Sequence, residues 1–265
     1  MTSLLTKIYF PALILLFCIL RLITLDLQPL SLDELTTVNL ISSDKGLSFI
    51  LDWIRLNDTQ LPLYYIIQYF VYHFIGESVF VLRLPSLIFS LLGVYFSYAF
   101  IKKNKGKETS QFVSLFLLSS FMMTFHSQEI RPYGLLFLLS TLSFTLSGVK
   151  SKKKIFYLTL FMLSITHYFG LALSIIQLVI KGIENRKENS LKKMSLVLLP
   201  CLILVYFFGK DFYTDLLVIH PFRDHLSIIN IINTIIYILG GKFLAASLIF
   251  VIGHNIFKDK KLDLK

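Results

Sequence analysis

The amino-acid sequence predicts an all-α polytopic membrane protein, with about eight transmembrane helices in a single domain over residues 1–265. Hydrophobic residues make up 55% of the chain, and the mean hydropathy is +0.71. Charged residues make up only 16%, whereas soluble domains carry about 25%. The apolar residues form long blocks with short lysine-rich stretches between them, which is the pattern of helices that cross a bilayer.

The lysine-rich stretches indicate which ends of the helices face the cytoplasm. Besides Lys7, they occupy residues 102–107, 150–154, 181–193 and 258–265. Short loops rich in Lys and Arg stay cytoplasmic, and this placement gives that side 18 of 26 basic residues but only 5 of 16 acidic ones. We therefore expect a multi-pass protein of an inner (plasma) membrane, with a cytoplasmic N-terminus. Since the net charge of +10 follows from these loops, no nucleic-acid partner is expected.

Each apolar block is assigned in chain order. Residues 8–25 are expected to remain as an uncleaved first span, because no small-residue cleavage site follows them. The further expected crossings are residues 81–101, 112–125 and 132–149, two crossings within 155–180 that turn at 166–170, and residues 194–208. Residues 226–257 hold either one span after an interfacial helix or two short spans. The first choice gives about eight spans and a cytoplasmic C-terminus.

Two outer loops follow from this arrangement. The second runs from 209 to 225, and the first, over 26–81, contains amphipathic stretches at 33–43 and 47–56. Residues 61–75 would reach only about 22 Å as a helix, short of a hydrocarbon core of ~30 Å. We expect that segment to lie along the interface, with its tyrosines, Tyr64 among them, at headgroup level.

Polar residues at the outer ends of the spans are candidate functional residues, because charge is costly at a membrane boundary. Asp33 and Glu34 are adjacent just after the first span, and Asp33 could act as a general base. It could instead be the N-cap of the helix that follows. Asp58 and Gln60, before Pro62, could orient a substrate or simply end a loop.

Three basic residues are expected on the same face. Arg83 and Arg131 could bind phosphate oxygens through the planar guanidinium group, or could snorkel to lipid headgroups or pair with Glu77 or Glu129. His167 could donate to a phosphate, bind a metal or be a packing group. Scattered along the chain, these residues would meet at one outer cavity.

Other chemistries receive no support. The sequence contains no P-loop, dinucleotide-binding glycine pattern or zinc motif, so a nucleotide site is not expected. Both cysteines, Cys18 and Cys201, lie in apolar segments and predict neither a disulfide nor a metal site. No cofactor is assigned, and a divalent cation is left open.

Several short motifs resemble those of the bacterial membrane glycosyltransferases of the GT-C fold, related to protein O-mannosyltransferases and lipid A aminoarabinose transferases. They are Leu32–Asp33–Glu34, Asp58–Thr59–Gln60–Leu61–Pro62–Leu63–Tyr64–Tyr65, Arg83–Leu84–Pro85–Ser86, Ser127–Gln128–Glu129–Ile130–Arg131–Pro132–Tyr133–Gly134 and Thr166–His167–Tyr168–Phe169–Gly170. The family's His-Pro-Pro is Gln60–Leu61–Pro62 here, and the Arg-Tyr pair of aminoarabinose transferases is Thr36–Thr37. These departures argue against a metal role for Gln60 and against an aminoarabinose substrate.

The resemblance implies an inverting transfer of a monosaccharide from a polyprenyl-phosphate donor to a glycan, lipid or protein acceptor, on the outer face of the bilayer. It implies Asp33 as the catalytic carboxylate, with Glu34 supporting it. Arg131, His167 and Arg83 match positions near the donor phosphate. The polar residues assigned to substrate orientation are Asp58, Gln60, Tyr64, Glu129 and Tyr133.

Two alternatives stay open. A polyprenyl-linked sugar transporter or flippase would need polar residues through the bilayer midplane, and the inner halves of the predicted spans are nearly uncharged. The chain is also shorter than most relatives, so an inactive, truncated GT-C subunit is the second alternative.

Overall fold

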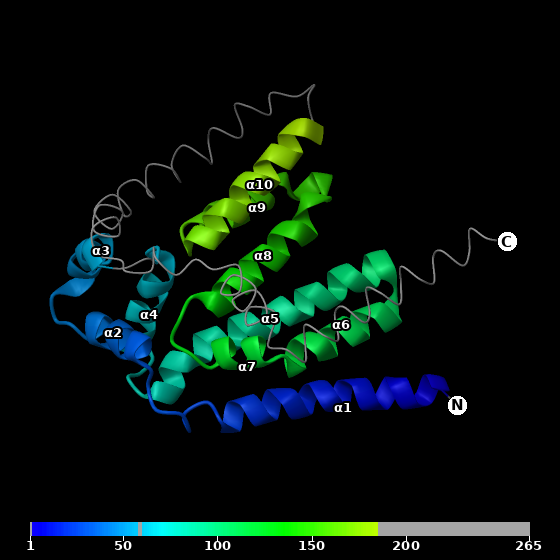
Figure 1. Ribbon diagram of the computed structural model, residues 1–265, viewed down its shortest axis with the longest axis horizontal. Coiled ribbons are helices and arrows are strands. Elements are labelled where there is room, and N and C mark those ends of the chain that lie inside the picture. Colours follow the sequence, from blue (N-terminus) through cyan, green and yellow to red (C-terminus); the bar gives the residue numbers. More distant parts are fainter. Residues whose placement is uncertain (1, 58–59, 185–265) are drawn as a thin grey trace, which may run out of the picture.

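The computed structural model describes residues 2–57 and 60–184, and helices account for the regular structure there (Figure 1). The helices are α1 (Thr2–Ile23), α2 (Leu32–Ile41), α3 (Gly46–Asn57), α4 (Leu63–Phe74), α5 (Val79–Lys105), α6 (Lys107–Ser119), α7 (Phe121–Ser127), α8 (Tyr133–Ser147), the short 3₁₀ helix η1 (Lys150–Lys152), α9 (Lys153–Ser164) and α10 (Tyr168–Glu184). The predicted span 194–208, the loop 209–225 and the block 226–257 lie outside the described residues.

The longest helix, α5, lies at the centre of the bundle, with α6 on one side and α8 on the other (Figure 1). Its 27 residues extend about 40 Å, enough to cross the ~30 Å hydrocarbon core. Close approach of α5 and α8 depends on Gly134, since a Cβ there would lie 2.5 Å from the carbonyl oxygen of Ser86. Helix α1 packs along α6.

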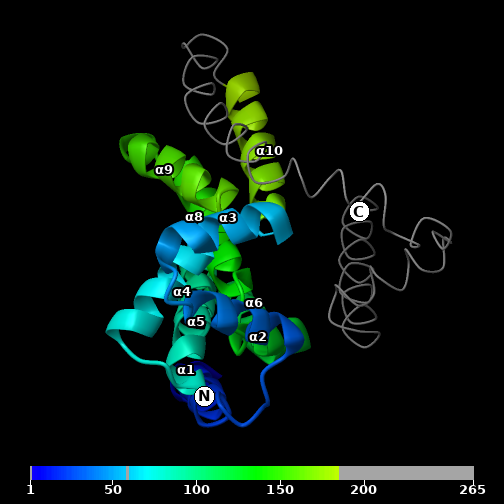
Figure 2. The same cartoon turned by 90° about the vertical axis from the view of Figure 1, so that its left-hand side faces the viewer.

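The predicted outer loop forms three short helices, α2, α3 and α4, which gather at one end of the bundle (Figures 1 and 2). The lysine-rich turn between α5 and α6 lies at the other end, as does the N-terminal end of α1 (Figure 1). The polar residues around Asp33 and the lysines at 102–107 are therefore separated by the length of α5. This is the arrangement that the distribution of positive charge predicts.

Helix breaks divide two of the predicted apolar segments, one at a position that was not predicted and one close to the predicted turn. The predicted crossing at 112–125 is interrupted at Ser120, whose extended backbone and hydroxyl group begin α7 by accepting from the Met123 amide at 3.2 Å. Two helices, α9 and α10, occupy the segment 155–180 for which two crossings are predicted, and the turn between them lies at residues 165–167.

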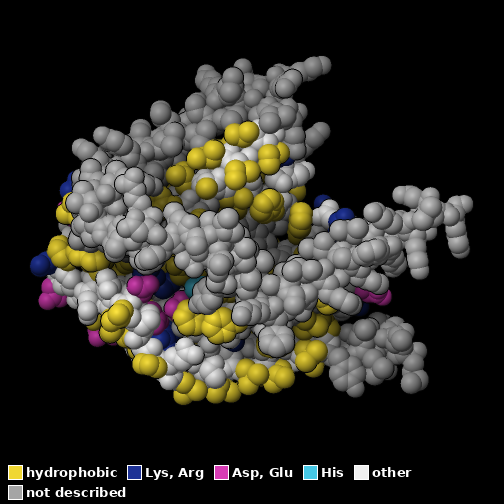
Figure 3. Space-filling view, viewed as in Figure 1, with side chains coloured by type: hydrophobic (Ala, Val, Ile, Leu, Met, Phe, Trp, Pro, Cys, Tyr) yellow, Lys and Arg dark blue, Asp and Glu magenta, His cyan; other side chains and the backbone are white. Residues whose placement is uncertain are grey.

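Many large apolar side chains face outward on the long helices, including Leu15 (61%), Ile23 (64%) and Tyr95 (61%). Figure 3 shows such side chains along one edge of the molecule and over part of its upper region. By length and composition, α5 is the one described helix that could cross a membrane; α1, α8 and α10 also contain shorter apolar stretches.

The expectation for the tyrosines of α4 is partly wrong. Tyr64 and Tyr65 are fully buried because they pack into the core between α4 and its neighbours. The exposed side of α4 instead carries Phe70 and Phe74.

Candidate functional site

The site begins at the first turn of α2. Ser31 is the N-cap, its hydroxyl accepting from the Glu34 amide at 3.3 Å, while the Glu34 carboxylate accepts from the Ser31 amide at 3.0 Å. This reciprocal pair is a capping box, which satisfies two amides at the helix start. Asp33 is therefore not the N-cap, and its side chain remains available for another role.

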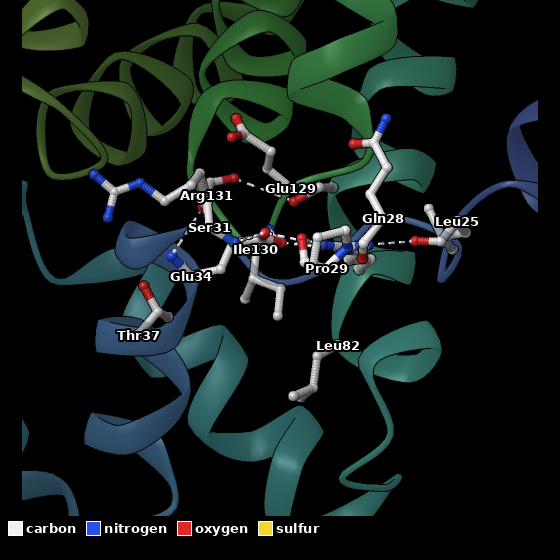
Figure 4. Close-up of polar contacts among 12 residues, drawn as sticks. Leu25, Gln28, Pro29, Ser31, Glu34, Thr37, Leu82, Glu129, Ile130 and Arg131 are labelled. Atoms are coloured by element: carbon white, nitrogen blue, oxygen red, sulfur yellow. Dashed lines mark hydrogen bonds and ion pairs between the residues drawn. The ribbon is translucent and has the colours of Figure 1, made fainter.

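Glu34 forms a buried ion pair with Arg83 of α5, and both residues are 1% exposed. Arg83 donates from Nε to Oε1 at 2.8 Å and from Nη2 to Oε2 at 2.9 Å, a bidentate geometry that is strong for this pair of groups. The Ile130 amide also donates to Oε1 at 2.9 Å. Helix α2, α5 and the loop before α8 thus meet at one carboxylate (Figure 4).

The remaining donors of Arg83 hold the segment between α1 and α2. They bond to three backbone carbonyl oxygens, those of Leu25 at 2.8 Å, Gln28 at 3.0 Å and Pro29 at 3.3 Å. These contacts explain how a guanidinium group can be buried at this point, because each of its nitrogens has an acceptor. They also leave Arg83 with no N–H group directed to a ligand, so its position supports the site from behind.

Burial of Glu34 raises the pKa of its carboxyl group, and the hydrogen bonds from Arg83, Ser31 and Ile130 lower it. The net result is a pKa below its ordinary value, because three donors favour the charged form. Glu34 is a carboxylate at neutral pH and fixes the site through its charge.

Asp33 lies on the open side of this framework. Its side chain is 71% exposed, and one carboxylate oxygen lies 3.4 Å from Nη2 of Arg131. In Figure 4 the Arg131 side chain extends away from the bonds of Glu34. The structure therefore brings the predicted base and one predicted phosphate-binding residue together, although they are 98 positions apart in the sequence.

Gln60 lies next to Arg131, and His167 is linked to Gln60 through the backbone. With its side-chain oxygen facing Arg131, Gln60 accepts from Nε at 3.1 Å and also from Nη2. The backbones of Gln60 and His167 pair as an antiparallel bridge, and the Leu63 amide donates to the Ile165 carbonyl at 3.2 Å. The turn between α9 and α10 is thereby fixed against the start of α4.

Tyr64 helps to hold the backbone of Arg131 in place through Ser86. Its hydroxyl lies 2.6 Å from Oγ of Ser86, and that hydroxyl donates to the Arg131 carbonyl at 3.1 Å. Gln68 donates to the Tyr64 oxygen at 2.6 Å. Burial raises the pKa of Tyr64 above its ordinary value, so it acts as a neutral hydroxyl within this network. Tyr64 therefore supports Arg131 from the interior.

Glu129 has a partner that sequence reasoning missed. Its carboxylate lies 2.8 Å from Nδ1 of His126, and the His126 ring packs against Tyr133 with centroids 4.3 Å apart. Tyr133 in turn lies 5.8 Å from the His167 ring. The available signal was the spacing of three between His126 and Glu129, since such residues lie close together at a helix end.

Asp58 falls outside the described residues, so nothing is added to its prediction. Among residues 2–57 and 60–184, no group of three or more His, Cys, Asp or Glu side chains could hold a metal ion. The described site offers an exposed carboxylate, a guanidinium group and an imidazole. This arrangement suits an anionic substrate that also carries a group to be deprotonated.

A bundle with outward-facing apolar side chains and a polar site at one end is typical of a membrane protein. A family model described as dolichyl-phosphate-mannose-protein mannosyltransferase matches residues 59–210, more than half of the chain. The chain belongs to this family, which has the GT-C fold. Asp33 and Glu34 precede the matched region. No curated protein and no solved structure matches the chain.

Proposed function

We propose that this protein transfers a monosaccharide from a polyprenyl-phosphate donor to a glycan, lipid or protein acceptor at the outer face of the membrane. The observation that carries the proposal is the placement of the exposed Asp33 carboxylate 3.4 Å from the Arg131 guanidinium group, in a chain of a mannosyltransferase family. The same proposal includes about eight membrane spans, a cytoplasmic N-terminus and an inner-membrane location.

In the proposed reaction, a hydroxyl or amine of the acceptor forms a bond to C1 of the sugar. The bond between C1 and the phosphate oxygen breaks, and the lipid phosphate leaves with the electron pair. Asp33 takes the proton of the acceptor. Arg131 and His167 stabilise the negative charge that develops on the leaving phosphate.

The other residues of the site have positioning roles in this proposal. Glu34 and Arg83 hold the first turn of α2 in place, so that Asp33 is presented in one position. Gln60 orients the guanidinium plane of Arg131, and Tyr64 fixes its backbone. The remaining orienting residues, Glu129, Tyr133 and Asp58, lie beside the donor sugar in this scheme.

The Asp33–Arg131 contact suggests an order of events. Before substrate binds, the two side chains neutralise each other. When the donor phosphate engages Arg131, it replaces Asp33 beside the guanidinium group, and the Asp33 carboxylate becomes free to meet the acceptor. Binding of the donor would thus precede activation of the acceptor.

The test is sugar transfer in membranes supplied with labelled polyprenyl-phosphate sugars. Asp33→Asn is expected to abolish transfer while the protein still inserts, because the amide cannot take a proton. Asp52→Asn, at an exposed position in α3, is the matched control and should transfer normally. Full transfer by Asp33→Asn would remove Asp33 as the base. Mass spectrometry of surface glycans, with and without the protein, would then identify the acceptor.

A further inference from the structure

A further buried arginine, away from the Asp33–Arg131 pair, has no role in the proposed mechanism. Arg21 lies in the last turn of α1 and is 3% exposed. Its Nη2 donates to the Leu118 carbonyl at 2.7 Å and to Oγ1 of Thr124 at 3.1 Å. It therefore lies at the junction of α1, α6 and α7.

The other two nitrogens of Arg21, Nε and Nη1, are buried and have no acceptor in the part of the chain that the structure describes. No described carboxylate forms an ion pair with it either. Arg83 is the useful comparison, because all its nitrogens are bonded and Glu34 balances its charge. A buried guanidinium group that lacks both a full set of acceptors and a counter-ion is costly. This indicates that an anion binds beside Arg21.

The location of Arg21 indicates which anion. It lies two residues before the end of α1, about 3 Å along the helix axis, and therefore near the level of the lipid headgroups. Neighbouring residues of α1, such as Leu20 (49%) and Ile23 (64%), are exposed and apolar. The guanidinium group suits phosphate oxygens, and lipid phosphates lie at this depth.

We propose that Arg21 is the centre of a second phosphate-binding site, which takes the phosphate of a membrane lipid at the junction of α1, α6 and α7. Entry requires the side chains over Nε and Nη1 to part slightly. The site connects to the first one through Gln128, whose amide nitrogen donates to the Arg21 carbonyl at 3.1 Å and to Oγ1 of Thr24 at 2.7 Å. Gln128 is three residues before Arg131, so lipid bound here would steady the loop that carries Arg131.

The test uses the purified full chain in nanodiscs of phosphatidylcholine, with phosphatidylglycerol added in increasing amounts. Native mass spectrometry counts the phosphatidylglycerol molecules retained. Arg21→Gln is expected to weaken this binding at least about tenfold, since it removes charged hydrogen bonds to phosphate. Lys45→Gln removes the same charge from the exposed turn before α3 and should bind as the unmodified protein does.

A second variant, Thr124→Asp, keeps Arg21 and tests lipid binding at this site even if Arg21→Gln does not fold. The new carboxylate would lie where Oγ1 now meets Nη2, so it would replace the lipid phosphate as the counter-ion. We expect this variant to lose phosphatidylglycerol binding about tenfold and to need no anionic lipid for stability. Unchanged binding in this variant would overturn the proposal.

Two further arms identify the source of the phosphate. Inorganic phosphate that stabilises the unmodified protein as well as the lipid does would overturn the assignment to a lipid. Undecaprenyl phosphate should also bind at Arg21, but the proposed donor site takes it as well. The phosphatidylglycerol arm is therefore the decisive one, and its outcome does not depend on whether the protein transfers sugar.

Discussion

Replacing Glu34 by glutamine is expected to lower the free energy of unfolding by about 3–5 kcal/mol, the range for removing one partner of a buried ion pair. The structure supports the upper part of that range. Glu34 accepts four hydrogen bonds, two from Arg83 and one each from the amides of Ser31 and Ile130. Each oxygen of Glu34 accepts two of these bonds, so in glutamine two donors would face an NH₂ group while the charge of Arg83 stays buried.

The assay is unfolding of the purified protein in detergent, followed by tryptophan fluorescence. Trp53 is the only tryptophan of the chain and lies in α3, which packs against α2 and α4. Its emission should therefore report the loss of the α2–α4 layer. A cost below about 1 kcal/mol would refute the reasoning, because an exposed pair contributes that little.

A double-mutant cycle separates the pair from its surroundings. Arg83→Met alone should also be strongly destabilising, since it leaves Glu34 without its counter-ion and removes the hydrogen bonds to three carbonyl oxygens. The double variant that combines Arg83→Met with Glu34→Leu should cost less than the sum of the single variants Arg83→Met and Glu34→Leu, because no charge remains buried. Additive costs would show that the two side chains do not interact in the folded protein.

Three further predictions follow from the site and the helix packing. The folded-state pKa of Glu34 lies below its ordinary value of 4.5. The stability that its charge contributes is therefore present above about pH 4.5 and is lost as the pH falls through the lower folded-state pKa. Unfolding measured from pH 7 to 3 should show this loss in the unmodified protein and not in Glu34→Gln. Gly134→Ala should cost about 1–3 kcal/mol by forcing α8 away from α5, whereas Gly148→Ala, which meets nothing within 4 Å, should be neutral in the same unfolding assay. Gln60→Leu should raise the KM for the lipid-linked donor roughly tenfold, because Arg131 loses a charged hydrogen bond that orients it; an unchanged KM at normal protein levels would contradict that role.

Much of the helical layout could be predicted from the sequence, because apolar blocks and lysine-rich turns are local signals. The boundaries of α5 and α8 agree with the predicted segments at 81–101 and 132–149 to within a few residues. The break at Ser120 was missed because the apolar run continues through it, and a single serine cap does not alter the hydropathy. The family resemblance is confirmed by the match over residues 59–210.

The partners of the charged side chains could not be predicted in the same way. Sequence reasoning offered Glu77 or Glu129 to the arginines, whereas Arg83 pairs with Glu34 and Glu129 with His126. Pairing across 49 residues depends on how α2 docks against α5, and local patterns carry no information about that docking. The gathering of Asp33 and Arg131 was predicted only through the orientation of the helices, as residues that emerge on one face.

The three carbonyl bonds of Arg83 have a practical consequence for protein engineering. They anchor the linker between α1 and α2 to the central helix, and none of them involves α3 or α4. Exposed residues of α3 could therefore be replaced while the position of Asp33 is kept by contacts that the change leaves intact.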